Sequence, residues 1–443
     1  MADTTALQLA VERMSYGPDA IAHTPEGKTV FVGGGVPGDV VQVTIDSDGP
    51  SFSKGHVAEV IEAAADRVAP RCPYAAICGG CPWAQLSYPA QASAKRAGVV
   101  DALTRIGHMP ADVSEALVAE CVSPSEPWGY RNKIELAFSR QSGKPLVGMH
   151  AAGGTGTVKV TSCLLLDKTY ASSVKSVAGA VSYLAGSRSL GFERIGIRAS
   201  ARTRELEVSL WDAPGGFPRA QAARVISDAT KATSIVRVME KGPAKARRIA
   251  GVEALSGSGS WGEIVGSERM RVSAPSFFQV NTAGAEKLVE LVMDALSPKP
   301  DDEAMDLYCG AGTFTLPLAR RTSFVSAVES YGPAVRDLRR NLESARLDNV
   351  DAVGGDAGRE FPDTDADVIV VDPPRAGLDA DVIRRLSEQP ARAIAYVSCD
   401  PATLARDLAR FAEAGTFRPV RVTPVDLFPQ TFHVETVTHL ARS

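Results

Sequence analysis

Two side chains near the C-terminus are of the types that covalent catalysis requires. The apolar run of residues 393–397 ends in the sequence SCDP, which carries Cys399, and a helical pattern follows. A cysteine at the tip of a buried strand faces whatever lies above the sheet, and its thiolate is the strongest nucleophile among ordinary side chains. Glu435 lies in the alternating segment 431–441, where an acid is unusual unless it is paired or functional. The pair predicts a nucleophile and a carboxylate base.

The segment EAMDLYCGAGTFTLPLAR (303–320) predicts a site for a nucleoside-bearing cofactor. An apolar strand enters a Gly-rich turn, and a helix follows. Gly310 and Gly312 allow a tight turn and a close approach of a ligand to the backbone. The third glycine of the dinucleotide fingerprint is missing, which disfavours a pyrophosphate and leaves room for a bulkier, uncharged ligand. Glu329 ends the next strand, where an acid can accept hydrogen bonds from ribose hydroxyls.

The later strands also end in polar residues. The third ends at Asp356, the fourth at Asp372 in the sequence DPPR, and the fifth at Cys399. Ligands bind at the carboxyl ends of the strands in open parallel α/β sheets. Polar residues at the ends of successive strands along one rim are hard to explain by core packing, so we expect a cofactor site with chemistry beside it. Arg375 could contact a phosphate or pair with a nearby carboxylate.

A cysteine, a carboxylate base and a nucleoside cofactor together indicate methyl transfer to carbon 5 of uracil. That carbon is too weakly nucleophilic to take a methyl group directly. Addition of a thiolate at carbon 6 makes an enolate that is nucleophilic at carbon 5 and attacks a sulfonium methyl. A base then removes the carbon-5 proton, and elimination frees the cysteine. The target base must leave any stack to be reached.

A second group of cysteines suits a soft metal centre. Cys72, Cys78 and Cys81 give C-x5-C-x2-C on a loop rich in glycine and proline. Either Cys163 or Cys121 could supply a fourth ligand. The spacing leaves open a [4Fe–4S] cluster or a zinc ion held by four cysteines.

Three regions of different pattern must position these residues. Residues 1–66 contain short Val-rich runs broken by turn signals, which predict a small antiparallel, OB-like barrel. Residues 67–270 predict a central α+β domain, in which a helix near 91–107 could pack on the catalytic domain instead. Residues 271–443 alternate strands and helices, which is typical of an α/β fold with a parallel sheet covered on both faces.

The charge distribution favours a polyanionic partner. The net charge is only -4, but residues 1–66 carry -7, residues 67–250 carry +12 and residues 251–443 carry -9. A basic middle is expected of a phosphate-binding surface, although a solvated basic face without a partner fits equally well. No apolar run reaches the length of about 18 residues that a membrane span needs. The first residues do not form a secretory signal, so we expect a cytoplasmic protein.

The motifs, taken together, resemble those of the S-adenosylmethionine-dependent RNA uracil-5 methyltransferases. The first 66 residues resemble the RNA-binding TRAM barrel of that family. The cysteine loop and the segment TSCLLLD resemble the cluster-binding parts of the bacterial 23S ribosomal RNA members, and YRNKIELAF resembles the start of their RNA-binding domain. Catalytic-domain motifs follow in order: SFFQVN, DLYCGAGTF, DPPRAGL, VSCDPATLARDL and HVETV.

The resemblance implies roles for named residues. It implies a Rossmann-like class I methyltransferase domain, with Cys399 as the nucleophile and Glu435 as the base. It selects Cys163 over Cys121 as the fourth ligand of a [4Fe–4S] cluster with Cys72, Cys78 and Cys81. It implies contacts with S-adenosylmethionine from Gln279, Tyr308, Thr313, Glu329, Asp356 and Asp372. Two positions depart from the family pattern, because Asp400 and Thr313 stand where asparagine is frequent.

The resemblance also implies an RNA substrate and no protein partner. Ribosomal RNA is the first expectation, and the T-loop uridine of tRNA is an alternative. A second alternative is an RNA-binding iron–sulfur protein that has lost catalysis. A third is an amino-directed methyltransferase, which would have no need of Cys399.

Overall fold

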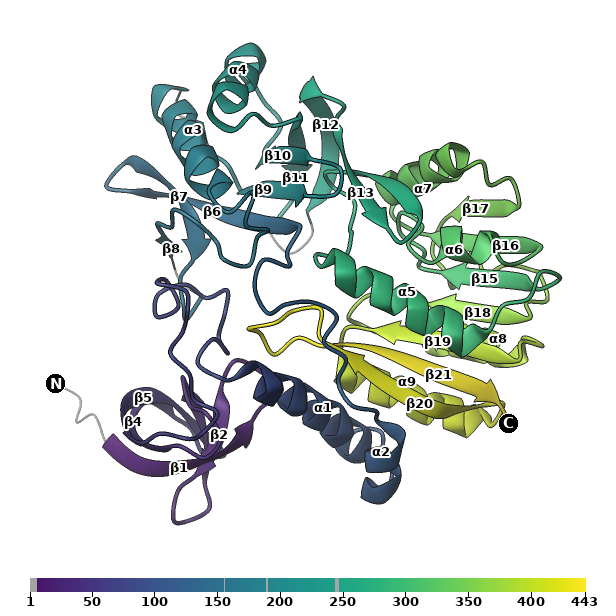
Figure 1. Cartoon of the computed structure of the whole chain (residues 1–443), viewed down its shortest axis with the longest axis horizontal. Coiled ribbons are helices and arrows are strands. Elements are labelled where there is room, and N and C mark those ends of the chain that lie inside the picture. The colour runs from purple at the N-terminus through teal and green to yellow at the C-terminus, as the bar shows by residue number, and fades with distance from the viewer. Residues whose placement is uncertain (1–5, 155, 189, 244–246) are drawn as a thin grey trace.

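The described residues form a closed barrel, two seven-stranded sheets and a two-stranded hairpin, joined by helices. The computed structural model describes residues 6–154, 156–188, 190–243 and 247–443. Figure 1 shows the N-terminal barrel at the lower left, the central sheet above it and the C-terminal sheet at the right, with helix α1 between the barrel and the C-terminal sheet. No helix in these described ranges is long and apolar enough to cross a membrane.

The first sheet closes into a barrel in the order β1-β2-β3-β5-β4. Alternate residues of these Val-rich strands point into its core, as the period of a strand requires. The expectation of an antiparallel barrel is wrong for one pair, because β3 and β5 run parallel. A closed ring of five strands cannot alternate in direction throughout, so one pair must be parallel. The strands are β1 (Ala6–Met14), β2 (Ala20–His23), β3 (Thr29–Gly33), β4 (Val40–Asp48) and β5 (Phe52–Glu62).

The central sheet has the order β12-β11-β10-β9-β6-β7-β8. Val177 and Leu184 of helix α3 belong to one buried cluster with Ile195 and Ile197 of β9. A separate hairpin, β13–β14, leads from this sheet to the C-terminal one. The elements are β6 (Lys133–Gln141), β7 (Lys144–His150), β8 (Thr157–Val158), α3 (Ser173–Arg188), β9 (Arg194–Ser200), β10 (Glu205–Asp212), α4 (Arg219–Thr230), β11 (Ser234–Lys241), β12 (Arg248–Gly257), β13 (Ser260–Val265) and β14 (Glu268–Ser273).

The C-terminal sheet has the order β17-β16-β15-β18-β19-β21-β20. Strands β15 to β19 are parallel, and β21 runs antiparallel to β19. The chain reverses direction across the sheet between β15 and β18, the position at which ligands bind in such folds. The elements are α5 (Thr282–Leu296), β15 (Glu303–Leu307), α6 (Thr315–Ala319), β16 (Phe324–Glu329), α7 (Gly332–Ala345), β17 (Val350–Gly354), β18 (Val368–Val371), α8 (Ala380–Glu388), β19 (Ala393–Ser398), α9 (Pro401–Ala414), β20 (Phe417–Val425) and β21 (Glu435–Arg442).

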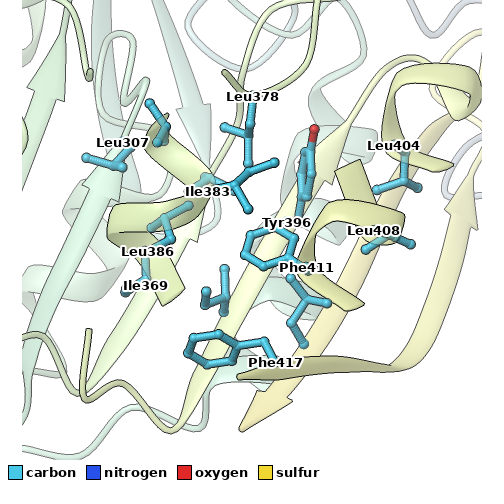
Figure 2. Close-up of a cluster of buried hydrophobic side chains, with 14 of the residues drawn as sticks. Leu307, Ile369, Leu378, Ile383, Leu386, Tyr396, Leu404, Leu408, Phe411 and Phe417 are labelled. Carbon is cyan, nitrogen blue, oxygen red and sulfur yellow. The ribbon is translucent and has the colours of Figure 1, made fainter. Parts of the chain in front are cut away.

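Strand β19 is buried along its whole length by helices on both faces. Figure 2 shows Tyr396 of this strand packed with Phe411 and Leu408 of α9. The Tyr396 hydroxyl donates a hydrogen bond of 2.8 Å to Asp407, which satisfies its polar atom inside the core. The tip of β19, which precedes Cys399, is therefore held by rigid packing.

Helix α1 (Tyr88–Arg105), followed by α2 (Ala111–Leu117), packs on the C-terminal sheet although it precedes the central one in sequence. The Ser87 side chain caps its first turn. Val99 and Leu103 of α1 belong to the same buried cluster as Phe411 of α9. The helix thus connects the barrel to the C-terminal part of the chain.

Candidate functional site

Cys399 and Glu435 meet at the ends of two neighbouring strands. Ser398, the last residue of β19, pairs with Thr436 of β21, so the antiparallel register places Cys399 opposite Glu435. The Thr436 hydroxyl fixes this end by donating to the Ser398 carbonyl at 3.1 Å. Glu435 is 3% exposed, and its Oε2 atom has no hydrogen-bond partner among the described residues. A buried oxygen without a partner is a candidate to act on a ligand.

In the free protein the pKa values of the acidic groups at the site are raised, so their ionised forms are disfavoured. Burial, followed by Glu435 and then Asp372, raises the pKa of the Cys399 thiol to about 12, and Arg375 partly opposes this. Burial and then Asp372 raise the pKa of Glu435 well above its usual value. Burial and then Glu329 raise the pKa of Asp372 to about 7. Because the charged neighbours of these groups other than Arg375 are acidic, a bound cation would favour the ionised forms of all three groups.

The Asp400 side chain caps the N-terminus of α9. Its Oδ1 atom accepts hydrogen bonds from the N–H groups of Ala402 at 2.9 Å and Thr403 at 3.0 Å, at the start of α9. The carboxylate raises the pKa of Cys399 less than burial, Glu435 and Asp372 do. Asparagine and aspartate cap helices equally well, which explains how an acid can stand at this position.

The Gly-rich turn after β15 forms the second part of the site. Tyr308 opens it with φ of 66°, and Gly312 has φ of +100°, a conformation that other residues avoid. A Cβ added at Gly312 would lie 2.5 Å from Leu316, whereas one added at Gly310 would meet open space. The backbone at Gly310 therefore leaves room for a ligand, and half-buried Thr313 follows in the same turn.

The acids expected at the rim lie beside this turn. Glu329 accepts from the N–H of Gly310 at 3.0 Å and from the N–H of Tyr331 at 2.6 Å. Asp356 accepts from the N–H of Gly358 at 3.1 Å. It is also the second cause, after burial, that raises the pKa of Tyr308 to about 12. These contacts bring Tyr308, Glu329 and Asp356 to one end of the sheet.

Gln279 lies in the segment between β14 and α5, and its backbone carbonyl accepts a hydrogen bond of 2.9 Å from the Asn132 side chain. Its side chain is 4% exposed, and its Oε1 atom has no hydrogen-bond partner among the described residues. Phe277, two residues earlier, is 67% exposed.

Two contributors to this end of the molecule carried no recognisable signal in the sequence. Tyr16, from the barrel, donates a hydrogen bond of 3.4 Å to the carbonyl of Cys399, which is 383 positions away. Asp306 of β15 lies fully buried and accepts from the Thr315 hydroxyl at 2.6 Å, directly below the Gly-rich turn. Only the tertiary fold relates either residue to the site.

The four cysteines of the expected cluster lie near one another. Burial and the neighbouring thiols raise the pKa of Cys78 and the pKa of Cys81, the latter to about 12. Burial also raises the pKa of Cys163, with Cys72 adding to it and the half-buried Arg131 opposing it. In the part of the chain that the structure describes, no group of three or more Cys, His, Asp or Glu side chains is arranged to hold a single metal ion.

Comparisons with known proteins place the chain in a family. Residues 266–443 match the family model described as tRNA (uracil-5-)-methyltransferase, and residues 6–58 match the TRAM domain. An uncharacterized RNA methyltransferase of Thermosynechococcus vestitus is 34% identical over 96% of this chain and 97% of its own. The chain belongs to the RNA uracil-5 methyltransferase family.

Other members of the RNA uracil-5 methyltransferase family match over nearly the whole length. The 23S rRNA (uracil(1939)-C(5))-methyltransferase of Chromohalobacter salexigens is 30% identical over 99% of this chain and 90% of its own. The structure of the Pyrococcus abyssi tRNA (uracil-54, C5)-methyltransferase in complex with S-adenosyl-L-homocysteine superposes with a TM-score of 0.74 and 23% identity. It covers 98% of this chain and 99% of that one. The expected family, fold class and class of enzyme are confirmed.

Proposed function

We propose that this methyltransferase transfers a methyl group from S-adenosylmethionine to carbon 5 of a uridine in RNA through a covalent adduct on Cys399. The observation that carries the proposal is the position of Cys399 opposite Glu435, whose buried Oε2 atom has no partner among the described residues. A nucleophile and a base on adjacent strands can act on two adjacent carbons of one ring.

The reaction divides between these two side chains. The Cys399 thiolate forms a bond to carbon 6, and the electrons of the 5,6 double bond move to the oxygen on carbon 4. Carbon 5 of this enolate takes the methyl group, and the sulfonium leaves as a thioether. The Glu435 carboxylate then takes the carbon-5 proton. The freed electron pair restores the double bond and expels the thiolate.

The residues of the Gly-rich turn fit the cofactor. When bound, S-adenosylmethionine supplies a methyl group on a positively charged sulfur, and that charge favours the ionised forms of the thiol and the carboxyls around it. Glu329 is placed to accept from ribose hydroxyls, and the open space at Gly310 admits the ligand to the backbone. The unpartnered buried oxygen of Gln279 suits the amino end of the ligand. Contacts from Tyr308, Thr313, Asp356 and Asp372 complete the proposed site.

The cysteine loop fits a [4Fe–4S] cluster held by Cys72, Cys78, Cys81 and Cys163. The N–H of Gly80 donates to Cys78, and those of Leu165 and Leu166 donate to Cys163, as is common around cluster thiolates. The methyl transfer needs no electron, so the group would be structural.

We further propose 23S ribosomal RNA, in the cytoplasm, as the substrate. Support comes from the full-length similarity to named 23S rRNA methyltransferases and from the cysteine loop that the sequence shares with such proteins. Residues 1–66 and 67–270 would bind phosphates, residues 271–443 would carry the chemistry, and exposed Phe277 would stack on an unpaired base. The T-loop of tRNA is the second candidate, because the tRNA methyltransferase of Pyrococcus abyssi shares the fold over nearly the whole chain.

The test uses RNA that contains 5-fluorouridine, supplied as 23S fragments or as a tRNA transcript, with S-adenosylmethionine. Fluorine cannot leave as a proton, so a carbon-5 methyltransferase stalls as a covalent protein–RNA adduct. We expect an adduct with the wild type and with Cys121→Ala, and none with Cys399→Ala. The RNA that gives the adduct identifies the substrate. Methyl transfer that persists in Cys399→Ala would instead support an amino-directed methyltransferase. Binding without transfer would support an RNA-binding protein without activity.

A further inference from the structure

The turn between β1 and β2 brings a barrel side chain to the catalytic turn. Tyr16 donates a hydrogen bond of 3.4 Å to the Cys399 carbonyl, and its ring meets the ring of Phe432 edge-on at a centroid distance of 6.0 Å. Burial, followed by the charges of Asp400, Cys399 and Glu435, raises the pKa of Tyr16, so its hydroxyl stays a neutral donor. The side chain is 38% exposed, so one side of the ring remains free to meet a ligand.

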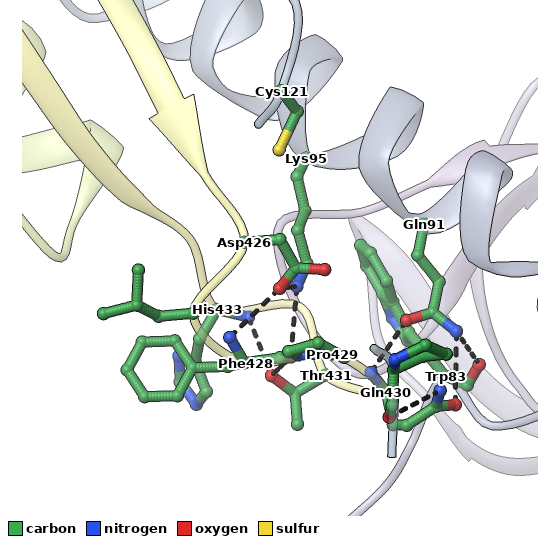
Figure 3. A network of polar contacts seen from close by, with 12 residues as sticks. Trp83, Gln91, Lys95, Cys121, Asp426, Phe428, Pro429, Gln430, Thr431 and His433 are labelled. Atoms are coloured by element: carbon green, nitrogen blue, oxygen red, sulfur yellow. Dashed lines mark hydrogen bonds and ion pairs between the residues drawn. The ribbon is translucent and has the colours of Figure 1, made fainter. Parts of the chain in front are cut away.

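Trp83 fixes this barrel turn to the segment that precedes Glu435. Its indole N–H donates to the Gly17 carbonyl at 3.1 Å, and its backbone N–H donates to the Gln430 carbonyl at 3.1 Å. Figure 3 shows Gln91 of α1 beside them: its amide donates to the Trp83 carbonyl at 3.2 Å and accepts from the Gln430 N–H at 2.7 Å. The hydrogen bonds of Trp83 therefore connect Gly17, which follows Tyr16, to Gln430, which lies two residues before Phe432.

The other end of the same segment is anchored by charge. The Lys95 ammonium pairs with Asp426 where both side chains are fully buried, and it also donates to the Phe428 carbonyl at 3.1 Å. Figure 3 shows both contacts below α1. A buried pair of this kind fixes geometry, because neither partner can move away without leaving a bare charge in the core. The segment that precedes Glu435 is thus fixed at both ends, and it carries Phe432, whose ring contacts Tyr16.

We propose that Tyr16 is a substrate-contacting residue, whose ring forms one wall of the pocket for the extruded uracil. The inference rests on the proposed function. A pyrimidine bonded through carbon 6 to the Cys399 sulfur must lie close to the backbone of Cys399, which the Tyr16 hydroxyl already touches. An aromatic wall suits a base of any orientation, because it contacts the flat face of the ring.

Tyr16 also borders a groove between the barrel and α1. This groove has a volume of about 890 Å³, and it is lined by Tyr16 together with Arg13 and Met14 of β1. Tyr16 thus borders this groove and also contacts the Cys399 carbonyl through its hydroxyl. The barrel would complete the active site directly, in addition to any general affinity for RNA.

Single-turnover methylation at saturating RNA tests the proposal. Tyr16→Ala should lower the rate by about tenfold or more while the dissociation constant for RNA changes less than about threefold, because the base is bound but poorly placed. Tyr16→Phe should keep the rate within about threefold, since the wall remains. Tyr183→Ala removes a tyrosine that is 60% exposed on α3 and should match the wild type. A wild-type rate in Tyr16→Ala, or a loss confined to RNA affinity, overturns the proposal.

A second measurement does not depend on RNA. Alkylation of Cys399 by iodoacetamide, followed by mass spectrometry of its peptide, reports how well the pocket covers the thiol. Tyr16→Ala should speed this alkylation by about threefold or more, and Tyr183→Ala should not. An unchanged alkylation rate would contradict a wall at Tyr16. If the wild type forms no adduct with RNA but Tyr16→Ala still speeds alkylation of Cys399, the proposed function is refuted. In that case Tyr16 would still be shown to cover the Cys399 thiol.

Discussion

Glu435 begins β21 directly opposite Cys399, the residue that follows the end of β19. Two strands that are neighbours in an antiparallel register thus carry the proposed nucleophile and base side by side. The backbone ladder sets their separation, and the hydrogen bond from Thr436 to Ser398 reinforces it. Substitutions at either position should therefore change chemistry with little effect on the fold.

Glu435→Gln should separate adduct formation from product release. The amide keeps the shape of the side chain but cannot take the carbon-5 proton, so elimination should slow by about a hundredfold or more. We expect a methylated protein–RNA adduct to accumulate with ordinary uridine RNA, visible as a slow band on a denaturing gel. Cys399→Ala with the same RNA is the control, and it should give no band. Free methylated RNA released by Glu435→Gln at the wild-type rate would exclude Glu435 as the base.

Asp400→Asn should make Cys399 more reactive. Burial is the main reason that the thiol pKa lies near 12, but Asp400 also raises it, and asparagine removes that charge while keeping the helix cap. Below its pKa the thiolate fraction rises about tenfold per pH unit, so a lower pKa increases alkylation at any fixed pH. We expect alkylation of Cys399 at pH 8 to rise about twofold to fivefold. Asp400→Ala, which removes the charge and the cap together, should also lower the melting temperature.

Asp306→Asn should stabilise the protein at high pH. Burial raises the pKa of Asp306 from its usual 3.8 to about 8. Between these values the unfolded chain releases a proton that the native protein retains, so stability falls as pH rises through this window. Asparagine removes that dependence, and we expect a gain on the order of 1–3 kcal/mol at pH 8. Urea unfolding at pH 8 and at pH 5 checks it. If the substitution changes the free energy of unfolding equally at both pH values, the Asp306 carboxyl is not protonated in the native state.

Gly312→Ala should damage the cofactor turn more than Gly310→Ala. Its added Cβ would lie 2.5 Å from Leu316 and 2.7 Å from Leu338, both fully buried, at a φ of +100°. We expect it to weaken binding of S-adenosylhomocysteine by about tenfold or more and to lower the melting temperature. Gly310→Ala has left-handed backbone strain but meets no other protein atom, so its loss of melting temperature should be smaller. Its added Cβ would occupy the space left for the ligand, so it should also weaken binding of S-adenosylhomocysteine. Thermal melting of both variants measures the difference, and a lower melting temperature for Gly310→Ala than for Gly312→Ala would contradict the clash at Gly312.

Cys163→Ser should remove the iron–sulfur group, whereas Cys121→Ser should not. Cys163 lies among the other three thiols, while Cys121 lies beside Asp426 and Lys95, with its pKa raised to about 12 mainly by burial. Protein purified without oxygen should contain about four iron atoms and four sulfides per chain in the wild type and in Cys121→Ser. One zinc ion in place of iron, or equal loss in both variants, would refute the proposed ligand set.

The parts of this molecule that follow from local pattern could be predicted from the sequence. The alternation of apolar runs and helices gave the parallel sheet, and Asp356 and Cys399 lie where strand ends were expected. Strand period likewise indicated the barrel. The single parallel pair of the barrel was not predictable in this way, because it follows from closure of an odd number of strands and not from any residue.

The contacts between distant segments could not be predicted. Tyr16 looks like an ordinary turn residue beside Gly17, and its relation to Cys399 exists only because Trp83 and α1 join the barrel to the C-terminal sheet. The cap formed by Asp400 could not be predicted either. The sequence shows an acid beside a thiol, but it does not show which N–H groups donate to that acid. Burial of Asp306 without a full set of partners is also a tertiary property.

The buried pair of Lys95 and Asp426 has a consequence for dissecting the protein. A fragment that begins at residue 271 would contain every residue proposed for the chemistry, yet Asp426 would lose the cation that neutralises it. The same cut would strip Val99 and Leu103 from the apolar face formed with α9. Such a fragment should aggregate or stay unfolded, and the smallest active enzyme must retain α1. The catalytic domain and α1 therefore form one packed unit, which a truncation at residue 270 would divide.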